Sequence, residues 1–199
     1  MNKSLFLLLV VFLYSVTLRS QKLNVVVNYV ANDAKASDNS IIYQPGKLLS
    51  WTDFKGAPVA GSDAAALTNA GFSVKLMFRR DEDNAQLVIS VNCSFSKKDS
   101  WVQPGSKTAY ILNHEQKHYD LAYIYTLLFI KELRAAKFTE KNYGSLIEEI
   151  HSKTGEALNE VQDQYDLETS HSRIPARQAE WDKKISEQLE EVSKSEAKL

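Results

Sequence analysis

The sequence predicts an α+β domain, with a strand-rich N-terminal half that forms a small twisted sheet and a C-terminal half of helices. Up to about residue 100, apolar and polar residues alternate in several short segments, which is the pattern of half-buried strands. From residue 104 onward, apolar residues recur at helical spacing, first in one long segment and then in two more. No repeat or low-complexity linker interrupts residues 21–199, so one domain accounts for them.

Three strands are expected in the N-terminal half. Residues 23–30 are β-branched and apolar, residues 70–80 alternate, and residues 87–95 follow a turn at residues 81–84. In the last strand the odd-numbered positions are apolar, which places Cys93 on the buried face. Because Cys93 is the only cysteine, no disulfide can form within the chain, and a core thiol is expected.

Three helices are expected in the C-terminal half. The first runs over about residues 107–137, which contain neither Pro nor Gly, and the Ser106 hydroxyl is its predicted N-cap. The second runs over about residues 144–169 with an apolar stripe along one face, and His151 in its middle is expected at the surface. The third follows Pro175, and its Lys- and Glu-rich faces are typical of solvent exposure.

Residues 1–20 have the features of a secretory signal peptide. Lys3 supplies the positive start, residues 5–18 are almost all apolar, and Leu18-Arg19-Ser20 places a small residue before a cut ahead of Gln21. An apolar stretch of this length is too short to span a bilayer comfortably, so no transmembrane segment is expected after cleavage. We expect an exported protein, in the periplasm or the medium. An uncleaved N-terminal anchor is the alternative.

The charge pattern excludes two classes of partner. The formal net charge is −1, and basic residues form no patch or stripe along the sequence. Nucleic acids and anionic membranes are bound through such basic surfaces, so neither is expected as a partner.

The segment His114-Glu115-Gln116-Lys117-His118 matches the metal-hydrolase pattern His-Glu-x-x-His. In a helix, residues four apart lie one turn above each other, so both imidazoles can bind one Zn²⁺. Glu115 is rotated about 100° from His114, beside the metal rather than on it. There its carboxylate can act as the general base toward a water whose pKa the metal lowers to about 7.

The surroundings of the motif favour a metal site. After His118 the predicted helix is apolar on nearly every side through residues 121–130, which is typical of a central buried helix. Polar side chains carried into such an interior cost free energy unless they have partners, and a metal ion provides one. The alternative is one core histidine bonded to a carbonyl and one surface histidine.

A catalytic zinc usually has three protein ligands and one open position, so a third ligand must come from elsewhere in the chain. The end of the second helix would return beside the start of the first, and His171 is the first choice there. Glu168 is the main rival, and Asp166 is expected to orient a ligand instead. A helix cap and solvated turn is the non-functional interpretation of this segment. Tyr165 and Arg173 are candidates for stabilising a developing oxyanion, by proximity alone.

Four segments together resemble a family, the predicted secreted zinc-dependent proteases of bacteria. They are Trp51-x-Asp53-Phe54-x-Gly56-x-Pro58, then Leu112-Asn113-His114-Glu115-Gln116-Lys117-His118-Tyr119-Asp120, then Tyr165-Asp166-x-x-Thr169-x-His171, and Gln178-x-x-Trp181. The resemblance implies a zincin-like fold, a zinc ion held by His114, His118 and His171, and a catalytic Glu115. The family commonly has Gly where Lys117 and Ser172 stand here, and the second difference affects the turn that presents His171.

The leading hypothesis is therefore a periplasmic or secreted zinc metallohydrolase, a peptidase, with a peptide or protein as substrate. A strand at a sheet edge near the motif helix would hold an extended peptide by strand addition. The alternative is a non-catalytic envelope protein, for binding or structure, in which zinc fastens the helices and its fourth position is closed.

Overall fold

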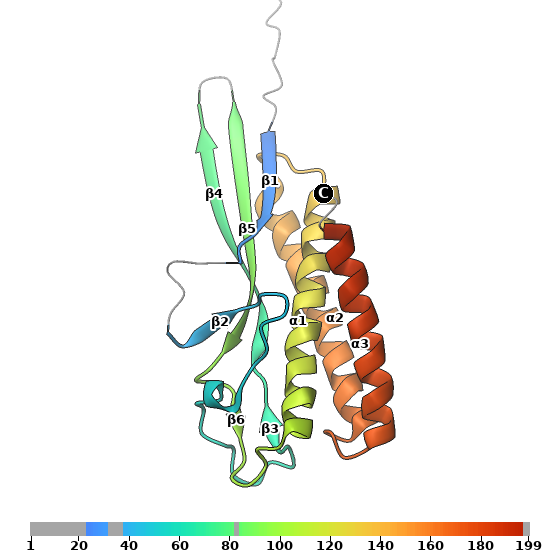
Figure 1. The fold of residues 1–199 in the computed structure, drawn as a ribbon. Coiled ribbons are helices and arrows are strands. Elements are labelled where there is room, and N and C mark those ends of the chain that lie inside the picture. Colours follow the sequence, from blue (N-terminus) through green and yellow to red (C-terminus); the bar gives the residue numbers. More distant parts are fainter. Residues whose placement is uncertain (1–22, 32–37, 82–83, 197–199) are drawn as a thin grey trace, which may run out of the picture.

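The computed structural model describes residues 23–31, 38–81 and 84–196. Within these residues strands precede helices along the chain, so the predicted α+β class is confirmed. Helix α1 lies between the sheet on one side and helices α2 and α3 on the other (Figure 1). The expected signal peptide lies outside the described residues, and none of the helices described is long and apolar enough to cross a membrane.

The main sheet is built around one long strand. Its four members are β1 (Leu23–Tyr29), β2 (Ser40–Ile42), β4 (Ala70–Arg80) and β5 (Ala85–Ser96). Strand β4 pairs antiparallel with β5 along one edge, while β1 (parallel) and β2 (antiparallel) follow each other along the other edge. Two short strands, β3 (Ala66–Leu67) and β6 (Trp101–Val102), form a separate antiparallel pair.

Strand β5 explains why one face of the sheet is core. Its buried residues alternate strictly with half-buried ones, and Cys93 is completely buried. Burial raises the pKa of the Cys93 thiol to about 12, since the interior disfavours a thiolate. The predicted core cysteine is confirmed.

The three helices are α1 (Ala109–Ala135), α2 (Tyr143–Thr169) and α3 (Pro175–Glu196). The bounds of α1 and α2 agree with the predicted ones to within two residues, and the third helix begins at Pro175, but the predicted N-cap of α1 is wrong. Thr108, not Ser106, caps the helix, because its Oγ1 accepts a hydrogen bond from the Ile111 amide at 3.2 Å. Ser106 lies in a turn instead, where its amide donates to the Gln103 carbonyl.

Helix α1 is buried on almost every side, as its sequence predicts. Toward the sheet, Phe129 stacks on Phe72 of β4 with ring centroids 5.0 Å apart. His151 of α2 contacts both rings edge-on at 5.0 and 5.7 Å, so it is half-buried among aromatics and the predicted surface position is wrong. The apolar periodicity of α2 does not distinguish a half-buried position beside its buried stripe from an exposed one.

A loop before β3 is held tightly against the chain that enters β6. It begins with the 3₁₀ turn η1 (Trp51–Asp53), and Phe54 after it is buried. The Gly56 amide donates to the Ser100 carbonyl at 2.8 Å, and a Cβ at Gly56 would lie 2.7 Å from the Lys98 carbonyl oxygen. Only glycine fits this close backbone approach, which fixes the chain that leads into β6 and so supports β3.

Candidate metal centre

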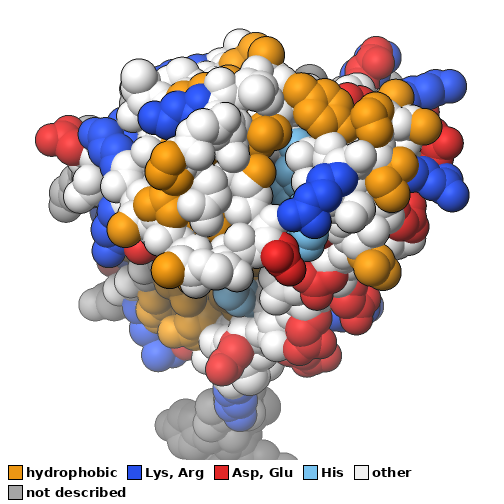
Figure 2. Space-filling view, turned by 90° about the horizontal axis from the view of Figure 1, so that it is seen from below, with side chains coloured by type: hydrophobic (Ala, Val, Ile, Leu, Met, Phe, Trp, Pro, Cys, Tyr) orange, Lys and Arg blue, Asp and Glu red, His pale blue; other side chains and the backbone are white. Residues whose placement is uncertain are grey.

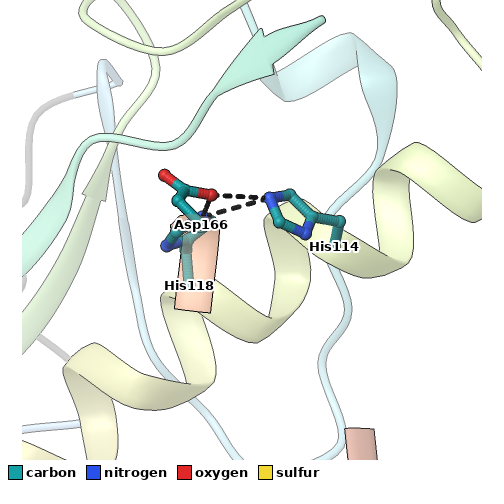
Figure 3. A group of neighbouring side chains, drawn as sticks. All are labelled: His114, His118 and Asp166. Atoms are coloured by element: carbon teal, nitrogen blue, oxygen red, sulfur yellow. Dashed lines mark hydrogen bonds and ion pairs between the residues drawn. The ribbon is translucent and has the colours of Figure 1, made fainter. Parts of the chain in front are cut away.

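Two histidines of α1 point to one spot. His114 and His118 are one turn apart, and both are buried. Their Nε2 atoms lie 3.3 Å from each other (Figure 3). The predicted convergence of the two imidazoles on one side of the helix is confirmed.

The third member of the cluster is Asp166 of α2. Because α2 runs back along α1, its C-terminal part lies beside the start of α1, and Asp166 Oδ1 is 3.0 Å from His114 Nε2 and 3.1 Å from His118 Nε2. Among the described residues, these three form a group whose potential ligand atoms all lie within 4.8 Å of one another. The cluster could therefore hold a metal ion.

The spacing of the three atoms fits a small tetrahedral ion. Ligands at about 2.0–2.2 Å from a tetrahedral zinc are about 3.3–3.6 Å from each other. The three distances in the cluster are 3.0, 3.1 and 3.3 Å. A metal ion would thus require these side chains to separate by only a few tenths of an ångström.

The other nitrogen of each ring is bonded to a glutamine. His114 Nδ1 lies 2.9 Å from Gln178 Oε1 of α3, and His118 Nδ1 lies 2.9 Å from Gln162 Oε1 of α2. Hydrogen bonds of this kind orient metal-binding imidazoles and leave Nε2 for the metal. Sequence reasoning missed both glutamines. Gln162 lies one helical turn before Asp166 and so shares its face, and Gln178 stands in one of the segments that carry the family resemblance.

Tyr165 forms the floor under the two imidazoles. Its ring stacks on His114 at 4.6 Å and meets His118 edge-on at 4.9 Å. The side chain is fully buried, and its hydroxyl accepts from Gln178 Nε2 at 2.5 Å. Burial raises the pKa of this phenol well above its usual range. Tyr165 therefore packs against both histidines, and its expected oxyanion role has no geometric support, since its side chain is buried and does not line the cleft.

Glu115 lies next to the cluster and lines the same cleft. The residue is 3% exposed, and its Oε2 atom is buried without a hydrogen-bond partner among the described residues. Burial raises the pKa of the Glu115 carboxyl, although His118 and His114 oppose the shift. A buried carboxylate oxygen of this kind needs a polar partner, and the cleft is where one can approach.

The electrostatics of the cluster favour an ionised Asp166. Partial burial disfavours its charge, but hydrogen bonds from His114 and His118 outweigh burial and hold the pKa of this carboxyl well below its usual range. For His118, burial lowers the pKa and the bond to Asp166 raises it, and the net result is a raised pKa. The carboxylate thus presents a negative oxygen to both rings, and the same oxygen suits a divalent cation.

The other expected ligands lie outside the cluster. His171 is 44% exposed in its side chain, and its Nδ1 is 3.4 Å from Asp166 Oδ1, beside the carboxylate rather than among the three atoms. Ligation by His171 stays a prediction. Glu168 as a ligand is wrong: it turns away from the cluster, and its carboxylate accepts from Trp181 Nε1 at 2.9 Å and from Gln164 at 2.7 Å.

The turn after α2 explains this arrangement. Ser170, His171 and Ser172 all have left-handed backbone angles, with φ of 50°, 50° and 67°. This turn carries the chain from α2 into α3 and leaves the His171 ring at the rim of the cleft. The Arg173 guanidinium donates a hydrogen bond to the Asp63 carbonyl. The expected oxyanion role of Arg173 has no geometric support, since this side chain joins two loops.

The cluster lies at the base of a cleft of about 500 Å³. One wall is the segment Ala64–Thr68, which contains β3, and the opposite wall is the C-terminal part of α2. Figure 2 shows this end of the molecule, where histidine side chains are visible in recesses of the surface. The arrangement gives a molecule from solvent access to the cluster and to Glu115.

Behind the motif, a second polar group anchors α1 to the loop after β2. Asp120 is buried and accepts from Tyr43 Oη at 3.0 Å, from Gln116 Nε2 at 2.8 Å and from Lys117 Nζ at 3.1 Å. Gln116 in turn accepts from the Leu49 amide at 2.8 Å. The two central residues of the motif therefore fix the helix in the fold and face away from the cluster.

Comparisons with known proteins add no assignment. A scan against protein-family models found none that matches the chain, and searches of curated proteins and of solved structures found no match either. The zincin-like fold and the resemblance to secreted zinc-dependent proteases therefore stay predictions. What the structure provides is a cluster of buried His114 and His118 with half-buried Asp166, able to hold a metal ion, beside a buried glutamate that lines the same cleft.

Proposed function

We propose that the protein is a zinc-dependent hydrolase of peptide bonds, with His114, His118 and Asp166 as metal ligands and Glu115 as general base. One observation carries the proposal: the three potential ligand atoms lie 3.0–3.3 Å apart at the base of a cleft that Glu115 also lines. The metal site and the general base thus line the same cleft, which a substrate can enter.

The donor set supports zinc over Mg²⁺ and Ca²⁺. Two imidazoles and one carboxylate form a known catalytic zinc set, whereas Mg²⁺ and Ca²⁺ prefer oxygen ligands. When bound, a zinc ion acidifies water and polarises a carbonyl oxygen, so hydroxide becomes available near neutral pH. Three protein ligands leave one position of a tetrahedral ion for this chemistry.

The remaining chemistry belongs to Glu115. Its position one residue after His114 places the carboxylate beside the ligand atoms and not among them. From there Glu115 can accept a proton from water and return it to a leaving amine. Burial raises its pKa, which improves a carboxylate as a base at neutral pH.

The wall of the cleft supports an extended peptide as the substrate. Strand β3 pairs with β6 along one edge, and in the part of the chain that the structure describes its second edge has no strand partner. An extended chain can add to such an edge through backbone hydrogen bonds, which recognise any sequence. We therefore assign the substrate's backbone to β3, the strand that lines the cleft.

The test is the substitution Glu115→Gln, which keeps the shape and removes the base. The purified protein and the variant are compared by metal analysis and by cleavage of a mixture of quenched fluorescent peptides. We expect equal zinc content and a loss of hydrolysis of about 10²–10⁴-fold. Glu187→Gln, at an exposed position of α3, is the matched control and should change neither quantity. Unchanged hydrolysis in Glu115→Gln would exclude Glu115 as the base.

A second candidate function is a zinc-stabilised binding or structural protein without turnover. It is favoured by His171, whose Nδ1 lies 3.4 Å from Asp166 Oδ1 and could close the fourth position of the metal. Chelation separates the two functions. A closed structural site should lose much of its free energy of unfolding when zinc is removed, whereas an open catalytic site on this core should lose activity first.

A further inference from the structure

The segment Gln178-x-x-Trp181 is part of the resemblance to the protease family but has no role in the motif chemistry. Its first residue, Gln178, is 1% exposed and belongs to α3. Its Oε1 atom lies 2.9 Å from Nδ1 of His114. Helix α3 therefore contributes a side chain that contacts the cluster of His114, His118 and Asp166.

The orientation of the Gln178 amide is fixed by its other partners. Its Nε2 atom donates to Asp182 Oδ1 at 2.8 Å and to the Tyr165 hydroxyl at 2.5 Å. A carboxylate only accepts hydrogen bonds, so the amide nitrogen must face Asp182 and the amide oxygen must face His114. Asp182 is itself held by Asn113 Nδ2, which donates to Oδ2 at 2.9 Å.

His118 has a less constrained partner. Gln162 Oε1 lies 2.9 Å from its Nδ1, but the Gln162 amide nitrogen has no hydrogen bond to any residue that the structure describes. The Gln162 amide can therefore rotate at little cost, whereas rotation of the Gln178 amide would place two acceptors, its own oxygen and Asp182, against each other.

We infer that Gln178 is a positioning residue for His114: it keeps a proton on Nδ1 and so leaves Nε2 as the nitrogen that binds the metal. The inference rests on the proposed metal site. Asp182 acts through Gln178. Helix α3 therefore contributes to the metal site in addition to packing against α1. Loss of such an outer hydrogen-bond partner typically weakens metal binding by about 10–100-fold.

The first experiment needs no metal. Proton and nitrogen NMR of the imidazoles in the metal-free protein should show a slowly exchanging, hydrogen-bonded proton on His114 Nδ1. In Gln178→Leu this signal should be lost, and in Gln188→Leu, an exposed position of the same helix, it should persist. A His114 Nδ1 without a proton in the unmodified protein, or an unchanged signal in Gln178→Leu, would overturn the inference.

The second experiment measures zinc affinity by competition with a chelator. We expect Gln178→Leu to bind zinc about 10–100-fold more weakly and Gln188→Leu to bind it normally. Asp182→Ala should shift the affinity in the same direction by a smaller factor, although Asp182 touches no ligand. It also serves as the test variant if Gln178→Leu does not fold. Equal affinities in Gln178→Leu and Gln188→Leu would contradict the inference. If the unmodified protein binds no zinc, the proposed function fails, and the NMR result still decides the role of Gln178.

Discussion

The two halves of α1 both contain many buried residues but are stabilised in different ways. The first half of the helix buries mainly polar side chains, including those of His114, Glu115 and Asp120, while the second half buries mainly apolar ones such as Leu127 and Phe129. The polar end needs specific hydrogen bonds from α2, α3 and the loop after β2, whereas the apolar end needs only shape and volume. Stability and function are thus separated along one helix.

The largest expected effect is at the apolar end. Phe129 is fully buried and stacks on Phe72, so Phe129→Ala should leave a cavity and lower the free energy of unfolding by about 3–5 kcal/mol. Denaturant unfolding measures this loss, and zinc affinity of the folded fraction should stay normal. If Phe129→Ala also weakened zinc binding, the two ends of α1 would be coupled and the separation would not hold.

The next effect is at the polar end and concerns the third ligand. Asp166→Ala removes the carboxylate whose Oδ1 lies 3.0 Å from His114 Nε2, so zinc affinity should fall by more than the roughly 10–100-fold that an outer partner costs. His171→Ala serves as the comparison, measured by the same chelator competition. We expect a smaller loss there, and the reverse order would make His171 the third ligand.

The smallest effect is at the loop that supports β3. In Gly56→Ala the new methyl group would meet the Lys98 and Ser100 carbonyls, so the free energy of unfolding should fall by about 1–3 kcal/mol. Zinc affinity should not change, because the loop contacts no ligand. Gly155→Ala in α2, where nothing lies within 4 Å of the new Cβ, is the control and should be neutral or stabilising. A normal stability of Gly56→Ala would show that this loop moves freely.

The periodic elements could be predicted from the sequence because their patterns are long. The strand positions around Cys93 and the start of α3 at Pro175 agree with the structure for this reason. Strands β3 and β6 have two residues each, too few for any periodicity, yet β3 forms a wall of the cleft. A wall of this kind depends on pairing between distant residues and leaves no local signal.

The candidate site likewise contains residues that the sequence predicts and residues that it does not. His114 and His118 could be predicted because their geometry depends only on the helix that carries them. The choice between Asp166 and His171 depends on how far α2 is rotated and on three left-handed residues in the turn after it, and local sequence determines neither. Gln178 stands in a segment that carries the family resemblance, but its role at the site follows only from its contact with His114.

The assembly of the cluster from separate helices has a consequence for which metal the protein acquires. His114 and Asp166 are 52 positions apart in the sequence. Gln178 follows Asp166 in the next helix, α3. Neither an unfinished nor an unfolded chain has the site, so the metal ion is chosen only where folding is completed. Imidazole and carboxylate ligands bind Cu²⁺ even more strongly than Zn²⁺. The supply of metal ions in the compartment of folding, more than the ligands themselves, then decides which ion occupies the cluster.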